Sequence, residues 1–147
     1  MAQVLESIAI DASRCVVFGL VRDQARRHQF LPAGWRILAL VTDLHDDVGA
    51  TMDLELVVGP RPVTLLMQTQ ESREHDTDVQ SQLVEAPPAA DNYITTWTVR
   101  DHSGGSQVFL HVDFSYGGAI GEFFASRRLR RACREMLQRL KVLAEAS

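Results

Sequence analysis

The sequence has no apolar run that approaches the ~18 residues of a membrane-spanning helix. Its first residues lack a basic segment and include Glu6 and Asp11, so we expect no signal peptide. It has only two cysteines, Cys15 and Cys133, which are too few for a disulfide framework. These features lead us to expect a reduced, cytoplasmic protein.

Motifs for metals, nucleotides and nucleophilic catalysis are also missing. None of the five histidines lies in an HExxH motif or in a Cys/His spacing typical of metal ligands, so we expect no metal site and no cofactor. Gly117, Gly118 and Gly121 match neither a Walker A motif nor GxGxxG. No serine lies in a nucleophile elbow. The sequence therefore names no reaction.

The composition is that of an ordinary globular protein, and its charge is unevenly placed. The chain has 147 residues, of which 46% are hydrophobic and 23% charged, and we expect residues 1–147 to form a single domain. The net charge of −4 disfavours a nucleic-acid-binding protein. Only one basic residue, Lys141, is a lysine, and seven of the 15 basic residues lie within 127–141.

Hydrophobic periodicity predicts a strand, two short helices, several strands and a long helix. Residues 2–10 alternate as a strand does, and Asp11 is a candidate N-cap for a helix over about 12–20. A second short helix begins near Asp23 and ends before Pro32. Strands and turns follow from 35 to 116, and a helix spans about 119–145.

Two hairpins predict a sheet with one apolar face and one solvated face. We place hairpin loops at 59–62 and at 103–106. In each hairpin, the apolar residues then fall on one side and the polar residues largely on the other. The cross-strand pairs predicted on the apolar side are Leu56–Leu65, Leu54–Met67, Trp97–Val112 and Thr95–Phe114.

This order of elements resembles a known superfamily. Together with the segments IAIDASRCVVFGLVRD, FLPAGW, YGGAIGEFF and LRRACREMLQRLKVLAE, it resembles the START-like helix-grip (SRPBCC) proteins, and more narrowly their polyketide cyclase/dehydrase and lipid-transport branch. The resemblance implies an α+β helix-grip fold. In this fold, a curved antiparallel sheet of about seven strands wraps around a long C-terminal helix, with two short helices after the first strand. It also implies a cavity between sheet and helix for an apolar or amphipathic small molecule.

The candidate cavity residues come from the apolar face of the sheet and from the last helix, although each of them could equally be a plain core residue. The candidate lining residues are Leu54, Leu56, Met67, Leu83, Trp97, Val99, Val112, Phe114, Met136 and Leu140. The candidate polar groups in the cavity are Tyr93, Tyr116 and Glu122, and each could instead lie at a strand end and reach water. Acid–base catalysis would need such an inward group. His111 and Asp113 fall on the solvated face.

The last helix carries an apolar stripe and an opposite face rich in arginine. Ile120, Phe123 and Phe124 fall on the arginine side, so we expect a break near 125–127 or a second surface that contacts the two phenylalanines. Phe123 and Phe124 are candidates for a cavity portal. The arginines could bind an anionic head group or an acidic protein, but we expect mainly a solvated face.

Three functions remain open. The first is binding or transport of a small hydrophobic, lipid- or polyketide-like molecule in the cavity. The second is a cyclase/dehydratase enzyme that uses the same cavity. The third is a protein-interaction module that uses the arginine face or the two phenylalanines. The sequence identifies no ligand, and it leaves homo-oligomerisation open.

Overall fold

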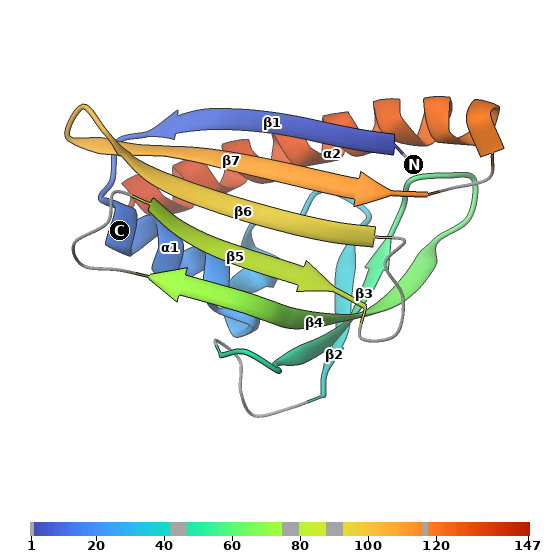
Figure 1. The fold of residues 1–147 in the computed structure, drawn as a ribbon, viewed down its shortest axis with the longest axis horizontal. Coiled ribbons are helices and arrows are strands. Elements are labelled where there is room, and N and C mark those ends of the chain that lie inside the picture. The colour runs from blue at the N-terminus through green and yellow to red at the C-terminus, as the bar shows by residue number, and fades with distance from the viewer. Residues whose placement is uncertain (1, 42–46, 75–79, 88–92, 116–117) are drawn as a thin grey trace.

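A computed structural model describes residues 2–41, 47–74, 80–87, 93–115 and 118–147 (Figure 1). The described residues form seven strands in one antiparallel sheet of order β1-β7-β6-β5-β4-β3-β2. The elements, in chain order, are β1 (Ala2–Ile10), α1 (Arg14–Arg22), the 3₁₀ helix η1 (Gln24–Gln29), β2 (Arg36–Leu40), β3 (Thr51–Leu56), β4 (Val63–Glu74), β5 (Gln80–Ala86), β6 (Tyr93–His102), β7 (Gly105–Phe114) and α2 (Gly118–Glu145).

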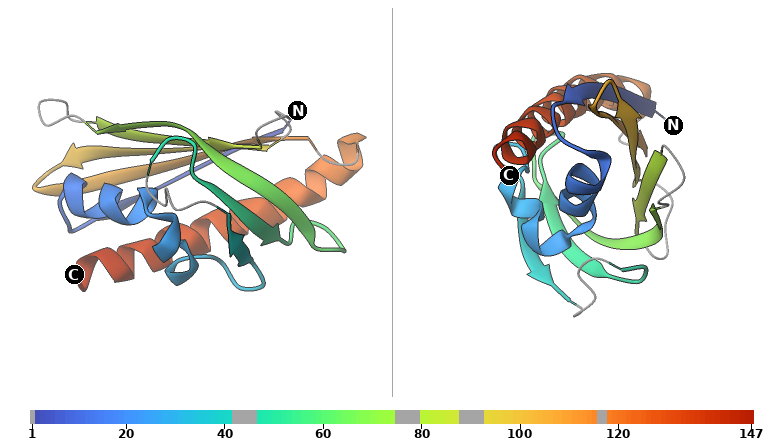
Figure 2. Two further views of the ribbon diagram at one scale, coloured as in Figure 1. Left: turned by 90° about the horizontal axis from the view of Figure 1, so that it is seen from below. Right: turned by 90° about the vertical axis from the view of Figure 1, so that its left-hand side faces the viewer.

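The sheet curls, and its helices lie on the concave side (Figure 2). Strands β2 to β7 follow one another as a meander, and β1 joins the outer edge of β7. Helix α1 packs on β5 and β6, while α2 packs along β1. This arrangement confirms the α+β helix-grip fold, including the two short helices after the first strand.

The alternation predicted for the two hairpins is confirmed, but the predicted pairs are wrong by two residues. Leu54 pairs with Leu65 rather than with Met67, and Trp97 pairs with Leu110 rather than with Val112. Because side chains alternate with a period of two, a shift of two residues keeps every side chain on its face. Buried inner-face residues include Leu54, Leu56, Leu83, Trp97, Val99, Leu110, Val112 and Phe114.

The β6–β7 hairpin shows why the pairing shifted. His102 pairs with Gly105, so Ser103 and Gly104 alone form the turn. Both have positive φ, 46° and 85°, which fits the type I′ turn that connects antiparallel strands through two residues. The predicted loop at 103–106 is too long because it included Gly105 and Ser106, which belong to β7.

The first helix begins later than its predicted cap implies. Its N-cap is Ser13, whose hydroxyl accepts a hydrogen bond from the Val16 N–H at 3.3 Å, and not Asp11. Strand β1 stays paired with β7 as far as Ile10, so the next residues are needed to turn the chain away from the sheet. The predicted start of the second short helix near Asp23 is confirmed, and the Asp23 carboxylate caps η1 by accepting from the Ala25 N–H at 3.0 Å.

Helix α2 is continuous from Gly118 to Glu145, so the predicted break near 125–127 is wrong. Its buried residues form a single stripe that starts only at Ala125. Ahead of this stripe, the helix extends beyond the end of β1 (Figure 1), which explains why Phe123 and Phe124 can lie on its solvent side without a bend. No helix formed by the described residues is long and apolar enough to cross a membrane.

Candidate functional site

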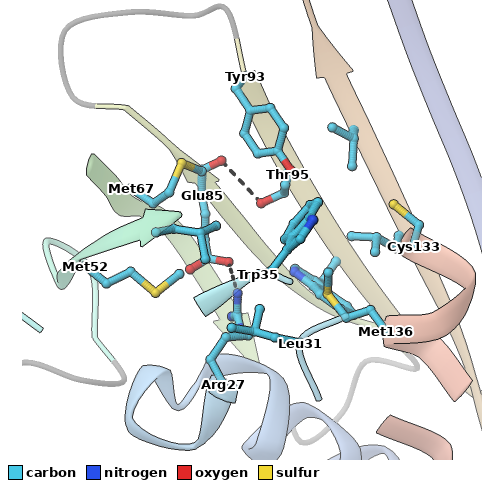
Figure 3. A pocket seen from close by; sticks show the side chains of 14 residues that line it. Arg27, Leu31, Trp35, Met52, Met67, Glu85, Tyr93, Thr95, Cys133 and Met136 are labelled. Carbon is cyan, nitrogen blue, oxygen red and sulfur yellow. Dashed lines mark hydrogen bonds and ion pairs between the residues drawn. The ribbon is translucent and has the colours of Figure 1, made fainter. Parts of the chain in front are cut away.

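A pocket lies between the concave face of the sheet, the segment that follows α1, and α2 (Figure 3). The sheet contributes residues of β3 to β7. Opposite the sheet, η1 and the segment after it contribute Arg27, Leu31 and Trp35, and α2 contributes Cys133 and Met136. The complete lining is Arg27, Leu31, Trp35, Met52, Leu54, Met67, Glu85, Tyr93, Thr95, Trp97, Leu110, Val112, Cys133 and Met136.

The pocket is nearly filled by its own side chains. The space open to the centre of a water molecule is about 20 Å³, which is close to the minimum needed for one water. Three of the four methionines of the chain, Met52, Met67 and Met136, line it. Methionine side chains are flexible and fill irregular space, which fits the small volume that remains in this pocket.

The residues proposed from sequence divide between this pocket and the surrounding core. Five of the ten apolar candidates line the pocket: Leu54, Met67, Trp97, Val112 and Met136. The other five are buried at 5% exposure or less but do not line it: Leu56, Leu83, Val99, Phe114 and Leu140. Helices α1 and α2 cover much of the concave face, so most inward residues contact protein and only some face open space.

The polar candidates divide in the same way. Tyr93 lines the pocket, whereas Glu122 is half-buried on α2 and does not. Tyr116 lies outside the described residues. Phe123 and Phe124 are exposed and do not line the pocket, so they do not form its wall.

A buried ion pair marks one end of the pocket (Figure 3). Arg27 Nη1 lies 2.8 Å from Glu85 Oε1, and the two side chains are 5% and 1% exposed. The second guanidinium nitrogen, Nη2, donates to the Val21 carbonyl at 2.6 Å. The guanidinium carbon also lies 5.5 Å from the ring centroids of both Phe30 and Trp97, within the range of a cation–π contact.

Uncharged polar groups surround Glu85. Its cross-strand neighbours are Thr69 on β4 and Thr95 on β6. The fully buried Gln24 donates from Nε2 to Thr69 Oγ1 at 3.3 Å and to Glu85 Oε2 at 3.4 Å. We call Arg27, Glu85, Gln24 and Thr69 the polar cluster. Two of its atoms, Arg27 Nε and Gln24 Oε1, are buried without a hydrogen-bond partner.

Tyr93 and Cys133 are the other titratable groups of the pocket. Burial, together with the nearby Cys133 and Glu85, raises the pKa of Tyr93 well above its usual value, and Arg27 opposes this effect. Burial also raises the pKa of Cys133 to about 12, with Glu6 adding to the rise and Arg130 opposing it. Both groups therefore stay protonated and uncharged at neutral pH.

The sequence analysis did not predict the polar cluster, although the alternation along β5 indicates the inward position of one member, Glu85. Ser81, Leu83 and Glu85 alternate along β5 and are all buried, so the predicted inward position of Leu83 also implied an inward Glu85. Arg27 carries no such signal, because a charged residue in a short helix is normally exposed.

A second hollow lies on the outside of Trp35. Trp35 lines both this hollow and the pocket, so its side chain borders the two spaces. The backbone just before Trp35 is attached to α2, because Glu135 accepts from the Ala33 N–H at 3.1 Å and Arg139 donates to the Leu31 carbonyl at 2.7 Å. The lining of this outer hollow is Pro32, Ala33, Trp35, Val57, Arg128, Arg131, Ala132 and Glu135.

Several other titratable side chains of the sheet lie outside the pocket. His111 and Asp113 are 3.6 Å apart and partly exposed, with side-chain exposures of 34% and 22%. Asp101 pairs with Arg14, and Glu71 pairs with Arg73. In the part of the chain that the structure describes, no group of three or more His, Cys, Asp or Glu residues is placed to hold a metal ion.

Comparisons with known proteins agree with the fold. The family described as polyketide cyclase / dehydrase and lipid transport matches residues 1–145. The solution structure of KanY is 22% identical, covers 99% of both chains and has a TM-score of 0.77. The crystal structure of TTHA0849 from Thermus thermophilus is 14% identical, covers 99% of this chain and 98% of its own, and has a TM-score of 0.70.

A structure of lower sequence identity has a similar fold. Ara h 8.0201 is 8% identical, covers 99% of both chains and has a TM-score of 0.62. At these identities, the likeness to solved structures concerns the fold alone. A search of curated proteins found no match.

Proposed function

This chain belongs to the polyketide cyclase / dehydrase and lipid transport family, and from that premise we propose that it binds a small, largely apolar molecule carrying one neutral polar group. The apolar part lies among the methionines and tryptophans of the pocket, and the polar group contacts the polar cluster. The observation that carries this proposal is the buried Arg27–Glu85 pair at one end of an otherwise mostly apolar pocket.

The ion pair is better explained by recognition than by stability. Well-packed apolar residues of similar volume stabilise a core as well as a buried ion pair or better. Of the two unpartnered atoms of the polar cluster, Arg27 Nε belongs to a residue that lines the pocket, and it is a hydrogen-bond donor. A hydroxyl or carbonyl oxygen on the ligand can accept a hydrogen bond from this N–H, and pairing removes the penalty of leaving the donor buried and unpaired.

The charge balance of the cluster favours a neutral group over an anion. Glu85 already neutralises Arg27 at 2.8 Å, so a ligand carboxylate would meet the carboxylate of Glu85 as well as the guanidinium of Arg27. Tyr93 adds an uncharged hydroxyl to the same pocket.

Binding requires the pocket to open, because the present space is about that of one water. We place the opening at Trp35, because it is the residue common to the linings of the pocket and of the outer hollow. The flexible side chains of Met52, Met67 and Met136 then adjust to the ligand.

The enzymatic alternative, cyclisation or dehydration of a polyketide-like substrate, needs an inward acid or base. Tyr93 is inward, but its raised pKa makes it a hydrogen-bond donor rather than a base at neutral pH. The Glu85 carboxylate is engaged by Arg27 and Gln24. This arrangement suits holding a polar group better than transferring a proton.

The chain provides its own reporter of binding, because its two tryptophans, Trp35 and Trp97, both line the pocket. Tryptophan fluorescence is titrated with cyclohexylbutanol and with cyclohexylbutanoate, which share their apolar part. We expect saturable binding of both, with the alcohol bound about tenfold or more tightly. Native mass spectrometry verifies the one-to-one complex.

The double variant Arg27→Met/Glu85→Leu is the control for the polar cluster. It is expected to keep binding while losing the preference for the alcohol. If neither probe binds the wild-type protein, the binding proposal is wrong. Tighter binding of the carboxylate would overturn the choice of a neutral group and leave the binding proposal standing.

A further inference from the structure

The first turns of α2 expose three large apolar side chains. Ile120, Phe123 and Phe124 are 77%, 59% and 58% exposed, and the two phenyl rings contact each other edge to face with centroids 5.5 Å apart. This end of α2 extends beyond the end of β1 (Figures 1 and 2). Neighbouring large apolar residues left in water are typical of an interaction surface.

Arginines continue the same face along the helix. With 100° per residue, Arg127, Arg128 and Arg131 fall on the same side of α2 as the phenylalanines, opposite the buried stripe. All three are exposed, and within the described part of the chain none of them forms a salt bridge. We call Ile120, Phe123, Phe124, Arg127, Arg128 and Arg131 the docking face. Its phenylalanines and arginines line one shallow hollow.

The neighbouring arginines differ in one respect. Arg130 and Arg134 contact Glu6 of β1 at 3.5 and 3.1 Å, so part of their charge is balanced inside the protein. The docking face therefore carries about three positive charges that are not neutralised locally. Its partner must supply both negative charge and an apolar layer.

A second copy of this chain fits the face poorly. A symmetric dimer through this face would place the arginines of one copy against those of the other, and like charges repel. Three apolar side chains also cover much less than the roughly 800 Å² that each partner buries in a stable protein complex.

We propose that the docking face binds an anionic lipid surface. Phe123, Phe124 and Ile120 enter the boundary between head groups and acyl chains, as apolar residues of interfacial helices do. Arg127, Arg128 and Arg131 contact lipid phosphates, for which the guanidinium is well shaped.

The charge of the rest of the chain favours a single orientation. Within 127–141 lie seven of the 15 basic residues and one of the 19 acidic residues, so the remainder is strongly acidic. An anionic surface repels this remainder and attracts α2. The outer hollow shares Arg128 and Arg131 with the docking face, so the bound orientation places the Trp35 opening beside the lipid.

Vesicle flotation tests the proposal. The probes are vesicles of phosphatidylcholine alone and vesicles in which about one quarter of the lipid is phosphatidylglycerol. We expect binding to the mixed vesicles, weak or no binding to neutral ones, and weaker binding as salt rises from about 0.1 M to about 0.5 M. Equal binding to both vesicle types, or no binding to either, would overturn the proposal.

Matched variants locate the surface. The triple variant Arg127→Gln/Arg128→Gln/Arg131→Gln is expected to weaken binding to mixed vesicles by about 100-fold. The double variant Phe123→Ser/Phe124→Ser is expected to weaken it by about tenfold or more. The controls are Val142→Ser, 63% exposed near the other end of α2, and Arg26→Gln, exposed on η1, and both should bind like the wild type.

Two further outcomes count against the proposal. Variants of the docking face that bind mixed vesicles like the wild type would show that another surface is used. A dimer that forms without lipid, as measured by sedimentation, and that Phe123→Ser/Phe124→Ser abolishes, would identify a second copy as the partner.

Discussion

At the scale of single residues, Glu85 is the side chain whose change tests the buried ion pair most directly. Glu85→Leu would leave the buried Arg27 guanidinium without its carboxylate at 2.8 Å. Removing one partner of a buried ion pair costs about 3–5 kcal/mol, because an uncompensated charge stays in the interior. We therefore expect a loss of this size in the free energy of unfolding, measured by urea denaturation.

The double variant Arg27→Met/Glu85→Leu tests the physical reason. It removes both charges, so most of the lost stability should return. A double variant that is as unstable as Glu85→Leu would show that the shape of these side chains matters more than their charge.

Because burial raises the pKa of Cys133, we expect the free energy of unfolding to fall in alkaline solution. Its pKa rises from 9.0 to about 12 on folding, so the unfolded chain releases this proton at lower pH than the folded protein does. The contribution of the protonated thiol to stability is complete below pH 9 and is lost as the pH rises from 9 toward 12. The loss reaches about 2 kcal/mol by about pH 10.5. Urea denaturation at neutral pH and at about pH 10.5 measures it.

The two single-cysteine variants separate this effect from other alkaline titrations. Cys133→Ala should lose less stability between the two pH values than the wild type does. Cys15→Ala, at the exposed cysteine, should lose as much as the wild type. An unchanged alkaline loss in Cys133→Ala would contradict the assignment.

At this scale, the sequence can predict which side chains of a strand point inward, but not which of them meet. Alternation along β5 places Glu85 beside Leu83 on the inner face. Its partner Arg27 lies 58 residues away in a 3₁₀ helix, and this pairing arises only when η1 packs beneath the sheet. Long-range pairs of this kind depend on the fold as a whole.

At the scale of secondary-structure elements, helix α1 offers a clear test of capping. Ser13→Ala removes the oxygen that accepts from the Val16 N–H and is expected to cost about 0.5–2 kcal/mol in the free energy of unfolding. Asp11→Ala, at the cap expected from sequence, should cost less, because Asp11 is exposed and lies ahead of the helix. Chemical denaturation of both variants decides between the two positions.

Elements also show why sequence patterns predict faces better than pairings. In both hairpins, the apolar face is right and the pairing is shifted by two residues, because periodicity fixes a side chain's face while turn geometry fixes its partner. In α2, the pattern of apolar residues is read correctly, but its change of face reflects the end of β1, the strand on which α2 mainly packs, rather than a bend. The length of the supporting surface is not visible in the helix sequence.

At the scale of the whole molecule, the nearly filled pocket links stability to binding. Side chains that fill the pocket stabilise the empty fold, and a ligand must displace some of them before it can bind. Met67 is 1% exposed and lines the pocket, whereas Leu83 is equally buried but does not. The two residues therefore allow the contribution of the pocket to be separated from that of the core.

Met67→Ala and Leu83→Ala should each lower the free energy of unfolding by about 2–5 kcal/mol, because each creates a cavity in a packed interior. Only Met67→Ala enlarges the space available to a ligand, so only this variant should bind cyclohexylbutanol more tightly than the wild type in the tryptophan titration. Binding then restores part of the lost stability by mass action, seen as a larger ligand-induced rise in Tm. Equal affinities in the two variants would mean that the ligand does not occupy the space beside Met67.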